Sequence, residues 1–325
     1  MAAISFSVVV PVFNGGALIA ETLHAITAQT LPPEIIVIDD GSTDDSAQVI
    51  RAFPSVRYHY MPNGGVGRAR NAGVALAQGD WIAFCDMDDL WRPTYLETVA
   101  GTLAPSSTHG FANWVDILGD EWTQQQKFWA LPPDFFAGLP RPLYTELIEA
   151  NPVWPSATFL RKDFFNAVGA FNPKFSRFAT EDFEFTLRCN EHPGAVIVHE
   201  PLVGIRKHAG NYSKGRIRQL LSDSAILAWC ADNHETGRRH QQRMVQVAMG
   251  RRSQALDEAF SQGNLPQVRE IARLIPTSHQ RKRTRIKVAL AHTRLVPGAL
   301  LRAAIGRPPE QDQVGRYAAA PATPE

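Results

Sequence analysis

The chain has 325 residues, of which 44% are hydrophobic, and its 33 basic and 32 acidic residues give a net charge of +1. This length suits one large domain or one domain plus an appendage, with enough apolar residues for a real core. The three cysteines are widely spaced and form no Cys-x-x-Cys pair, which argues against a disulfide framework or a structural zinc site and favours a reducing compartment.

The chain also carries no membrane or export signal that we can recognise. The N-terminus lacks the basic region of a signal peptide, and no stretch reaches the roughly 18 apolar residues that a membrane-spanning helix needs. We therefore expect a cytoplasmic protein, soluble or peripheral on the cytoplasmic face of a membrane.

The first 100 residues alternate between strand and helix patterns. Runs of β-branched and aromatic residues predict buried strands, and apolar residues at helical spacing predict helices between them. In chain order the elements are a strand over 4–12, a helix over 17–29, a strand over 34–38, a helix over 45–53, a strand over 56–60, a helix over 68–77 and a strand over 81–85. This order predicts an α/β fold with a mainly parallel central sheet and helices on both faces.

The remainder of the chain divides near residue 215, where the charge balance changes sign. The part before Arg216 has 15 basic and 23 acidic residues, and the part from Arg216 onward has 18 basic and 9 acidic ones. The irregular stretch over 105–180 predicts substrate-facing loops over short strands. Helices are predicted over 219–231, 241–260, 265–274 and 285–295. We expect one domain over 1–215, a basic helical extension over 216–306 and a disordered tail over 307–325.

Three carboxylates gather within four positions at the end of the fourth predicted strand, in the sequence Asp86-Met87-Asp88-Asp89. Like charges this close repel one another and lose hydration, so a cation or a polar ligand is expected to offset them. Carboxylate oxygens suit Mg²⁺ or Mn²⁺, above all when substrate phosphates complete the coordination sphere. An acidic turn in which Asp86 caps the next helix explains this cluster equally well.

Polar residues also follow other predicted strands. Asp39 and Asp40 open a turn that offers helix caps. Arg68 and Arg70 follow a glycine loop at a helix N-terminus, a place suited to a diphosphate, although either arginine could simply be solvated. The glycine spacing fails the Gly-x-Gly-x-x-Gly pattern, which argues against a dinucleotide site.

Taken in order, six short motifs resemble the family 2 glycosyltransferases, which have the GT-A fold. The motifs are Val9–Asn14, Ile38–Asp44, Ala69–Asn71, Asp86–Asp89, Thr180–Asp182 and Arg206–His208. The resemblance covers residues 4 to 215 and implies a nucleotide-binding half over 1–100 and an acceptor-binding half over 101–215. Processive membrane synthases of this family add a Gln-x-x-Arg-Trp motif and transmembrane helices. Both are missing here, so the resemblance favours single transfers.

The resemblance implies a reaction and a set of donor-binding residues. The reaction is the inverting, metal-dependent transfer of a sugar from a nucleoside-diphosphate sugar, above all a UDP-sugar, to a hydroxyl of a saccharide or lipid-linked acceptor. The residues expected to bind the donor are Pro11, Phe13, Asn14, Asp40, Arg68, Arg70, Asp86 and Met87. Within this set, Asp40 would accept a hydrogen bond from the uracil imide. Strand-end turns and helix capping are the structural alternatives.

The same resemblance implies the catalytic residues. Asp88 would bind Mn²⁺ or Mg²⁺, with Asp86 and His208 as further metal contacts. Asp182 would be the general base, oriented by Glu181, although both could instead be acids of a first helical turn. Trp154 is the candidate to stack on an acceptor sugar, with a core position as the alternative.

Two other function classes remain open from the sequence. One is a catalytically silent nucleotide-binding or scaffold subunit that acts through its basic C-terminal region. The other is a nucleotidyltransferase, for which Asn14-Gly15-Gly16 is a poor phosphate loop.

The basic region itself has several possible partners. Residues 279–287, followed by an apolar stretch over 295–305, could hold the protein on an anionic membrane; a solvated face or a homo-oligomer contact is the alternative. The run has no aromatic residues to stack on bases, which argues against nucleic acid.

Overall fold

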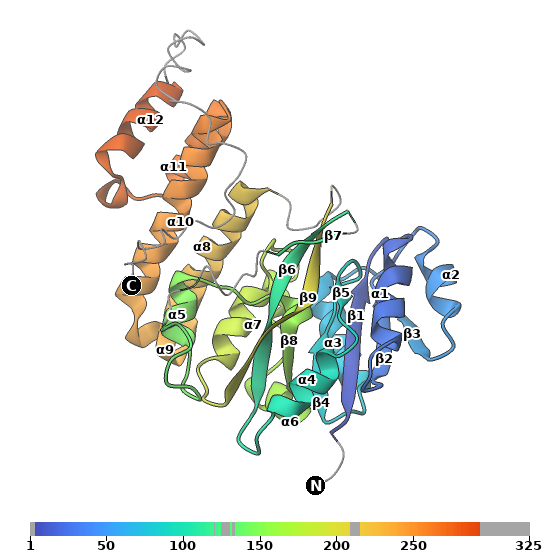
Figure 1. Cartoon of the computed structure of the whole chain (residues 1–325). Helices are drawn as coiled ribbons and strands as arrows, with labels where there is room; N and C mark the ends of the chain where they lie inside the picture. Colours follow the sequence, from blue (N-terminus) through green and yellow to red (C-terminus); the bar gives the residue numbers. More distant parts are fainter. Residues whose placement is uncertain (1–3, 120, 125–130, 132–133, 209–214, 293–325) are drawn as a thin grey trace, which may run out of the picture. The chain divides into compact units, whose positions relative to one another are not determined.

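The computed structural model describes residues 4–119, 121–124, 131, 134–208 and 215–292. The chain divides into two compact units, Met1–Asn211 and Tyr212–Glu325. The first unit contains every described strand, and the second contains helices (Figure 1).

A nine-stranded mixed sheet forms the centre of the first unit. Its strands are β1 (Phe6–Val12), β2 (Glu34–Asp39), β3 (Val56–Tyr60), β4 (Trp81–Phe84), β5 (Leu90–Trp91), β6 (His109–Leu118), β7 (Glu121–Trp122), β8 (Thr158–Arg161) and β9 (Ala195–Lys207). The order across the sheet is β3-β2-β1-β4-β8-β6-β9-β5, and β7 pairs with β6.

Strand direction decides which loops can meet. β1 to β4 pair in parallel, β8 runs antiparallel to both β4 and β6, and β6 pairs in parallel with β9. Consequently β6 and β9 run in the same direction as β1 to β4, and their C-terminal ends lie at the same edge of the sheet. The expectation of a mainly parallel sheet is confirmed, because among the described strands only β5, β7 and β8 run the other way.

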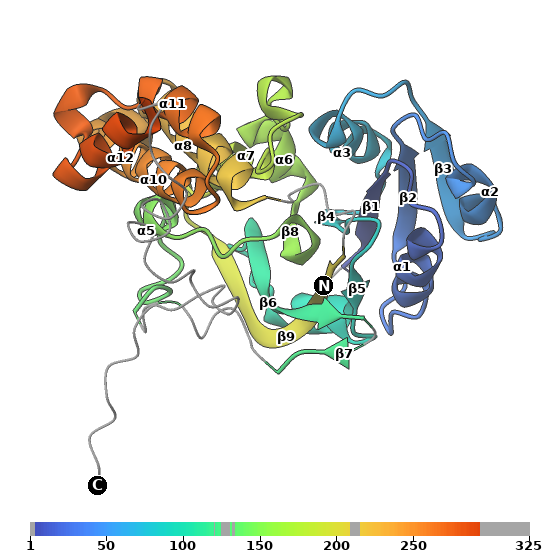
Figure 2. The same ribbon diagram turned by 90° about the horizontal axis from the view of Figure 1, so that it is seen from above.

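Helices cover both faces of this sheet. They are α1 (Leu18–Thr27), α2 (Ser46–Arg51), α3 (Val66–Leu76), α4 (Tyr95–Thr102), α5 (Tyr144–Glu149), α6 (Lys162–Val168) and α7 (Asp182–Cys189). Successive side chains of a strand point to opposite faces, so Val8 and Val10 of β1 join one apolar core with α1 and α4. Val9 joins a second core with α3, α6 and α7, which lie together in Figure 2.

The stretch over 105–180 is more regular than its composition predicts. β6 is a ten-residue strand with seven consecutive buried residues, and not a loop over short strands. Asn113 and Asp116 interrupt the apolar pattern of β6, and both find their partners on the neighbouring strand β9. The Asn113 side chain donates to the His199 carbonyl at a bulge in the pairing with β9, and Asp116 forms an ion pair with Lys207.

The second unit consists of helices in its described part. They are α8 (Arg216–Asn233), α9 (Glu235–Arg239), α10 (Gln241–Ser261), α11 (Leu265–Arg273) and α12 (Lys282–His292). α10, α11 and α12 share a core that includes Leu256, Phe260, Val268 and Ile271. No helix among the described residues is long and apolar enough to cross a membrane. The apolar stretch over 295–305 and the tail over 307–325 lie outside the described residues.

Candidate active site

Most of the residues singled out in the sequence follow strands that end at one edge of the sheet. Asn14 follows β1, Asp40 follows β2, the Asp86–Asp89 loop follows β4, and His208 follows β9. Because these four strands run in the same direction, residues far apart in the chain can meet there.

Asp88 and His208 form the most direct of these contacts. The Nε2 atom of His208 lies 2.8 Å from Oδ2 of Asp88, and the two side chains are 26% and 13% exposed. Burial and the neighbouring Asp86 raise the pKa of Asp88, and the hydrogen bond from His208 opposes that shift. The pair thus presents a carboxylate oxygen and an imidazole nitrogen at the end of β4.

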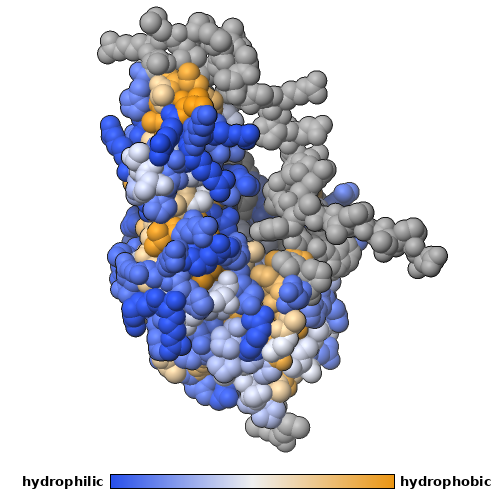
Figure 3. Space-filling view, turned by 90° about the vertical axis from the view of Figure 1, so that its left-hand side faces the viewer, coloured by the Kyte–Doolittle hydropathy of each residue, from blue (hydrophilic) through white to orange (hydrophobic). Residues whose placement is uncertain are grey.

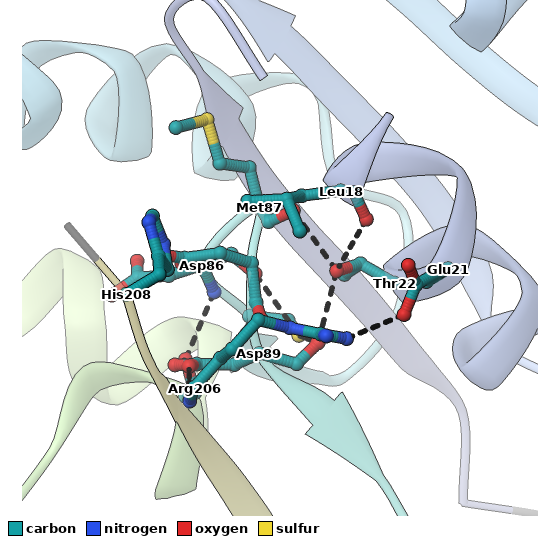
Figure 4. Close-up of polar contacts among 11 residues, drawn as sticks. Leu18, Glu21, Thr22, Asp86, Met87, Asp89, Arg206 and His208 are labelled. Atoms are coloured by element: carbon teal, nitrogen blue, oxygen red, sulfur yellow. Dashed lines mark hydrogen bonds and ion pairs between the residues drawn. The ribbon is translucent and has the colours of Figure 1, made fainter. Parts of the chain in front are cut away.

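Asp89 anchors the loop and does not face the open edge. It is 2% exposed; its Oδ2 accepts from the Ser156 hydroxyl at 2.5 Å, and its Oδ1 accepts from the Arg206 backbone N–H at 3.0 Å. The Thr22 hydroxyl of α1 lies 2.9 Å and 3.0 Å from the carbonyl oxygens of Met87 and Asp89 (Figure 4). The loop that carries Asp86 and Asp88 is therefore tied to α1, β9 and the residues before β8.

Arg206 fastens the same loop from β9. Its Nε donates to the Asp88 carbonyl at 3.0 Å, and its Nη2 pairs with Glu21 of α1 at 2.6 Å (Figure 4). The side chain is 8% exposed, so this cation is used inside the fold and is poorly placed to meet a substrate phosphate. Because Arg206 holds the Asp88 backbone and precedes His208 by two residues, it keeps Asp88 beside His208.

Arg70 connects the acidic loop to the start of α7. Its Nη2 pairs with Oδ1 of Asp86 at 2.7 Å and its Nη1 pairs with Oε1 of Glu181 at 2.5 Å, while the side chain itself is 2% exposed. Such a buried cation is stable only because two carboxylates neutralise it. Arg70 was expected to contact a diphosphate. In the structure it holds two acidic residues 95 positions apart in the chain.

Asp182 is the first residue of α7 and follows Glu181 directly. Burial and the negative charge of Glu181 raise the pKa of Asp182 to about 8, and the Arg70 charge opposes the shift. Carboxylates whose pKa lies this far above the ordinary value concentrate at functional sites. The half-buried Asp182 can therefore take up a proton at a pH where ordinary carboxylates cannot.

Asp40 shapes the glycine loop before α3. It is 3% exposed, and its two carboxylate oxygens accept hydrogen bonds from the backbone N–H groups of Gly64 and Gly65 at 2.7 Å and 2.8 Å. Each oxygen keeps a second lone pair, so a further donor such as an imide N–H could still bind. Gly65 has a φ of 91° and lies against Ser176, where an added Cβ would come within 2.6 Å of the Ser176 carbonyl oxygen. Only glycine fits this turn.

The other predicted donor-binding residues lie in or after β1, in the loop after β4 and at the start of α3. Pro11 is buried in β1, Phe13 is 46% exposed, and Met87 is half-buried against the core beneath α1. Asn14 fastens the turn after β2, since its side-chain oxygen accepts from the Thr43 N–H at 2.8 Å. Arg68 is exposed and has no ion-pair partner within the part of the chain that the structure describes.

Trp154 is half-buried with its ring faces occupied. The Trp114 ring lies 5.5 Å away, and the Lys207 Nζ lies 4.9 Å from the Trp154 ring centre. Its indole N–H is buried and has no hydrogen-bond partner among the described residues. The half-buried ring thus packs against Trp114 and Lys207, and an acceptor sugar would have to displace Lys207 to stack on the face that it covers.

Comparison with known proteins identifies this arrangement. Residues 7–166 match the family model described as glycosyl transferase family 2. The first unit is a family 2 glycosyltransferase domain. An uncharacterized glycosyltransferase of Nostoc sp. is 34% identical over 127 residues, which make up 37% of this chain and 39% of that relative. The chain thus spans about two fifths of that relative's length.

Solved structures place the glycosyltransferase domain in the GT-A fold. Residues 1–349 of TarS from Staphylococcus aureus, solved in complex with UDP-GlcNAc, superpose with a TM-score of 0.63 at 20% identity and cover 82% of this chain and 79% of that one. The mannosyltransferase PcManGT from Pyrobaculum calidifontis, solved with GDP-Man and Mn²⁺, has a TM-score of 0.53 at 19% identity. The match covers 93% of this chain and 86% of that one. The predicted fold class is therefore confirmed.

A divalent metal fits the glycosyltransferase site in part. Two ligands about 2.1 Å from one octahedral Mg²⁺ lie about 3 Å apart, close to the 2.8 Å between Asp88 Oδ2 and His208 Nε2. Asp86 has one oxygen committed to Arg70. Within the described ranges, no three or more His, Cys, Asp or Glu side chains are arranged to hold a metal. Asp88 and His208 are the two predicted metal ligands that lie in direct contact, and substrate oxygens would have to supply the other positions around a bound metal.

Sequence reasoning missed the supports of this site. Thr22 and Glu21 lie within a predicted helix, and neither was singled out. A signal was present for Thr22, because it lies between Ile19 and Ile26 on the apolar face of α1, where a hydroxyl needs a partner. Arg70 is among the predicted donor-binding residues, but its place one turn from Gly67 and Val74 on the buried side of α3 signals a support inside the fold.

Proposed function

We propose that the protein is an inverting, metal-dependent glycosyltransferase. It would move a sugar from a nucleoside-diphosphate sugar, a UDP-sugar first, to a hydroxyl of a saccharide or lipid-linked acceptor, in single transfers in the cytoplasm. The observation that carries the proposal is the Arg70 bridge from Asp86 to Glu181. It ties the loop that carries the Asp88–His208 pair to the start of α7, where Asp182 lies. The UDP-GlcNAc in TarS and the GDP-Man and Mn²⁺ in PcManGT support the donor and metal classes.

On the donor side, the loop after β2 and the start of α3 would receive the nucleotide. Asp40 holds the Gly64–Gly65 turn and keeps lone pairs for a base N–H, while Phe13 offers an exposed ring. The exposed cation of Arg68 at the N-terminal turn of α3 would attract the diphosphate. A divalent cation bound by Asp88 and His208 would offset charge on the departing nucleoside diphosphate as a Lewis acid.

On the acceptor side, Asp182 would act as the general base. It would accept the proton of the acceptor hydroxyl as the hydroxyl oxygen attacks the anomeric carbon and the bond from that carbon to the diphosphate breaks. A base works best when its pKa lies near the working pH, and the pKa of Asp182, about 8, meets that condition. Glu181, held by Arg70, would orient Asp182 and keep its pKa raised.

Two other functions are less well supported. A nucleotidyltransferase needs free backbone N–H groups after β1, but those of Gly15 and Gly16 already donate to Ser46 and Asp44. A silent nucleotide-binding subunit accounts for the predicted donor-binding residues but gives no role to Asp182, whose pKa is raised to about 8 at the start of α7.

The test is nucleotide release from a panel of UDP-, GDP- and dTDP-sugars, with Mn²⁺, with Mg²⁺ and with EDTA. We expect one donor to be hydrolysed or transferred with metal and not with EDTA. For the variant Asp182→Asn in the same assay, the matched control is Asp163→Asn. Asp163 is an exposed aspartate of α6, and its ion-pair partner among the described residues is Arg161. If no donor is turned over while nucleotide binding by calorimetry persists, the silent-subunit reading replaces this proposal.

A further inference from the structure

The second unit carries a cluster of unpaired cations at one end. From Ile271 to Pro309 the chain has nine basic residues and no acidic one. Five of the basic residues are described and exposed, and we call them the basic surface: Arg273, Arg281, Lys282, Arg283 and Arg285. Such a run of one sign, without compensating acids, creates a strong local field.

The internal contacts of α12 show that these cations are not used for folding. Thr284, Val288 and Ala291 lie on one side of α12 and face the core of the unit. Lys287 also turns inward, since it pairs with Asp257 at 2.6 Å. In the described part of the chain, none of the five residues of the basic surface has an ion-pair partner, and Arg285 donates only to the Thr277 carbonyl.

Apolar side chains are exposed beside the basic surface. Leu274, which follows α11, is 46% exposed, and Ile286 of α12 is 52% exposed. The segment between the two helices runs along the start of α12, because Gln280 donates to the Ile275 carbonyl and Arg285 to the Thr277 carbonyl. In the space-filling view of Figure 3, an apolar patch lies among hydrophilic residues near the top of the coloured surface.

We propose that the basic surface, with Leu274 and Ile286, is a docking surface for an anionic lipid membrane. Cationic side chains attract the negative surface potential of anionic lipids, and the two exposed aliphatic side chains can enter the interface between headgroups and acyl chains. A lipid surface accounts for both features. Nucleic acid accounts only for the charge, because residues 271–292 contain no Phe, Trp or Tyr to stack on a base.

The size of the effect follows from the number of cations. Each basic residue near an anionic membrane strengthens partitioning by about fivefold. Removing three of them should therefore weaken binding by about 100-fold. Salt should weaken it as well, since the Debye length falls from about 10 Å at 0.1 M to about 3 Å at 1 M ionic strength.

The experiment is co-sedimentation of the full chain with two kinds of vesicle. One contains phosphatidylcholine alone, and the other contains phosphatidylcholine with about 30% phosphatidylglycerol, an anionic lipid. The variant is the triple change Arg281→Gln, Lys282→Gln and Arg283→Gln. The matched control removes the same charge with Arg238→Gln, Arg239→Gln and Arg243→Gln. Arg238 and Arg239 lie in α9, and Arg243 lies in the first turn of α10. The length of α10, about 30 Å, separates this turn from the end that leads to α11 and α12 (Figure 1).

We expect salt-sensitive binding to the anionic vesicles and none to phosphatidylcholine alone. The affinity should fall by about 100-fold in the variant of residues 281–283 and change only a few-fold in the control. Ile286→Ser should weaken binding severalfold and leave the salt dependence unchanged. No binding to anionic vesicles, or equal loss in both triple variants, would overturn the proposal. Binding of a single-stranded oligonucleotide by a protein that ignores the vesicles would overturn it too. Because the experiment measures membrane binding, its result does not depend on whether the protein transfers sugars.

Discussion

Replacing Arg70 by methionine tests the bridge between the acidic loop and α7. The change keeps an unbranched side chain but removes the guanidinium group and its charge, which leaves Asp86 and Glu181 without their cation. Breaking a buried ion pair by removing one partner costs about 3–5 kcal/mol. Glu181 is 7% exposed and Asp86 is 24% exposed, so solvent relieves part of the second loss, and we expect about 3 kcal/mol.

Tryptophan fluorescence during urea unfolding can measure this loss, because six of the seven tryptophans belong to the first unit. With a urea slope of about 1–3 kcal/mol per M, the midpoint should fall by about 1 M or more. Arg68→Met is the matched control on the same helix, and its exposed position predicts a change within about 0.5 kcal/mol.

A double-mutant cycle with Glu181→Gln separates the bridge from simple packing. Glu181→Gln should cost much less in the Arg70→Met background than in the wild type, because the pair is already broken. Arg70→Met should also move the acid limb of kcat/KM to higher pH, since the Arg70 charge lowers the pKa of Asp182. Unchanged midpoint and unchanged acid limb together would refute the reasoning.

Three further predictions concern the same edge of the sheet. In the wild type, kcat/KM should rise with pH through an apparent pKa of about 8 as Asp182 loses its proton, and a flat profile from pH 6 to 9 would contradict this role. Asp88→Ala and His208→Ala should each weaken Mn²⁺-dependent nucleotide binding by tenfold or more in calorimetry and leave metal-free binding unchanged. Asp89→Ala should lower stability by about 2–4 kcal/mol in urea, because the buried Arg206 N–H and Ser156 hydroxyl lose their acceptor; an unchanged midpoint would show that the loop is anchored elsewhere.

The first four strands and the helices between them could be predicted from the sequence because each has one clear periodicity. β1 is buried along its whole length, and α1 carries Ile19, Leu23 and Ile26 at helical spacing. β6 was less predictable. Asn113 and Asp116 break its pattern, and their partners on β9 are about 90 residues away in the chain.

The candidate site could be predicted as a set of residues but not as a set of contacts. The motifs pointed to Asp88 and His208, yet their contact depends on β9 running in the same direction as β4, which no local pattern shows. Arg68 and Arg70 look alike in the sequence. On α3 they lie about 200° apart, so one is exposed and the other is buried between two carboxylates.

Stability and activity should respond in opposite ways to Asp182→Asn. A carboxyl whose folded pKa is raised to about 8 holds its proton more tightly in the folded protein than in the unfolded chain. Its contribution to stability is therefore present at pH 4 and is lost as the pH rises to 8. The asparagine variant should be at least as stable as the wild type at pH 8, which removes misfolding as a reason for lost activity.

The most direct test of the account is the rate of a single turnover by Asp182→Asn, with the donor found in the screen, at pH 8 and with Mn²⁺ present. We predict that transfer falls by at least about 100-fold while the affinity for the nucleoside diphosphate stays within about twofold, because Asp182 serves the acceptor hydroxyl and not the donor. Near-normal transfer by this variant would contradict the assignment of Asp182 as the base.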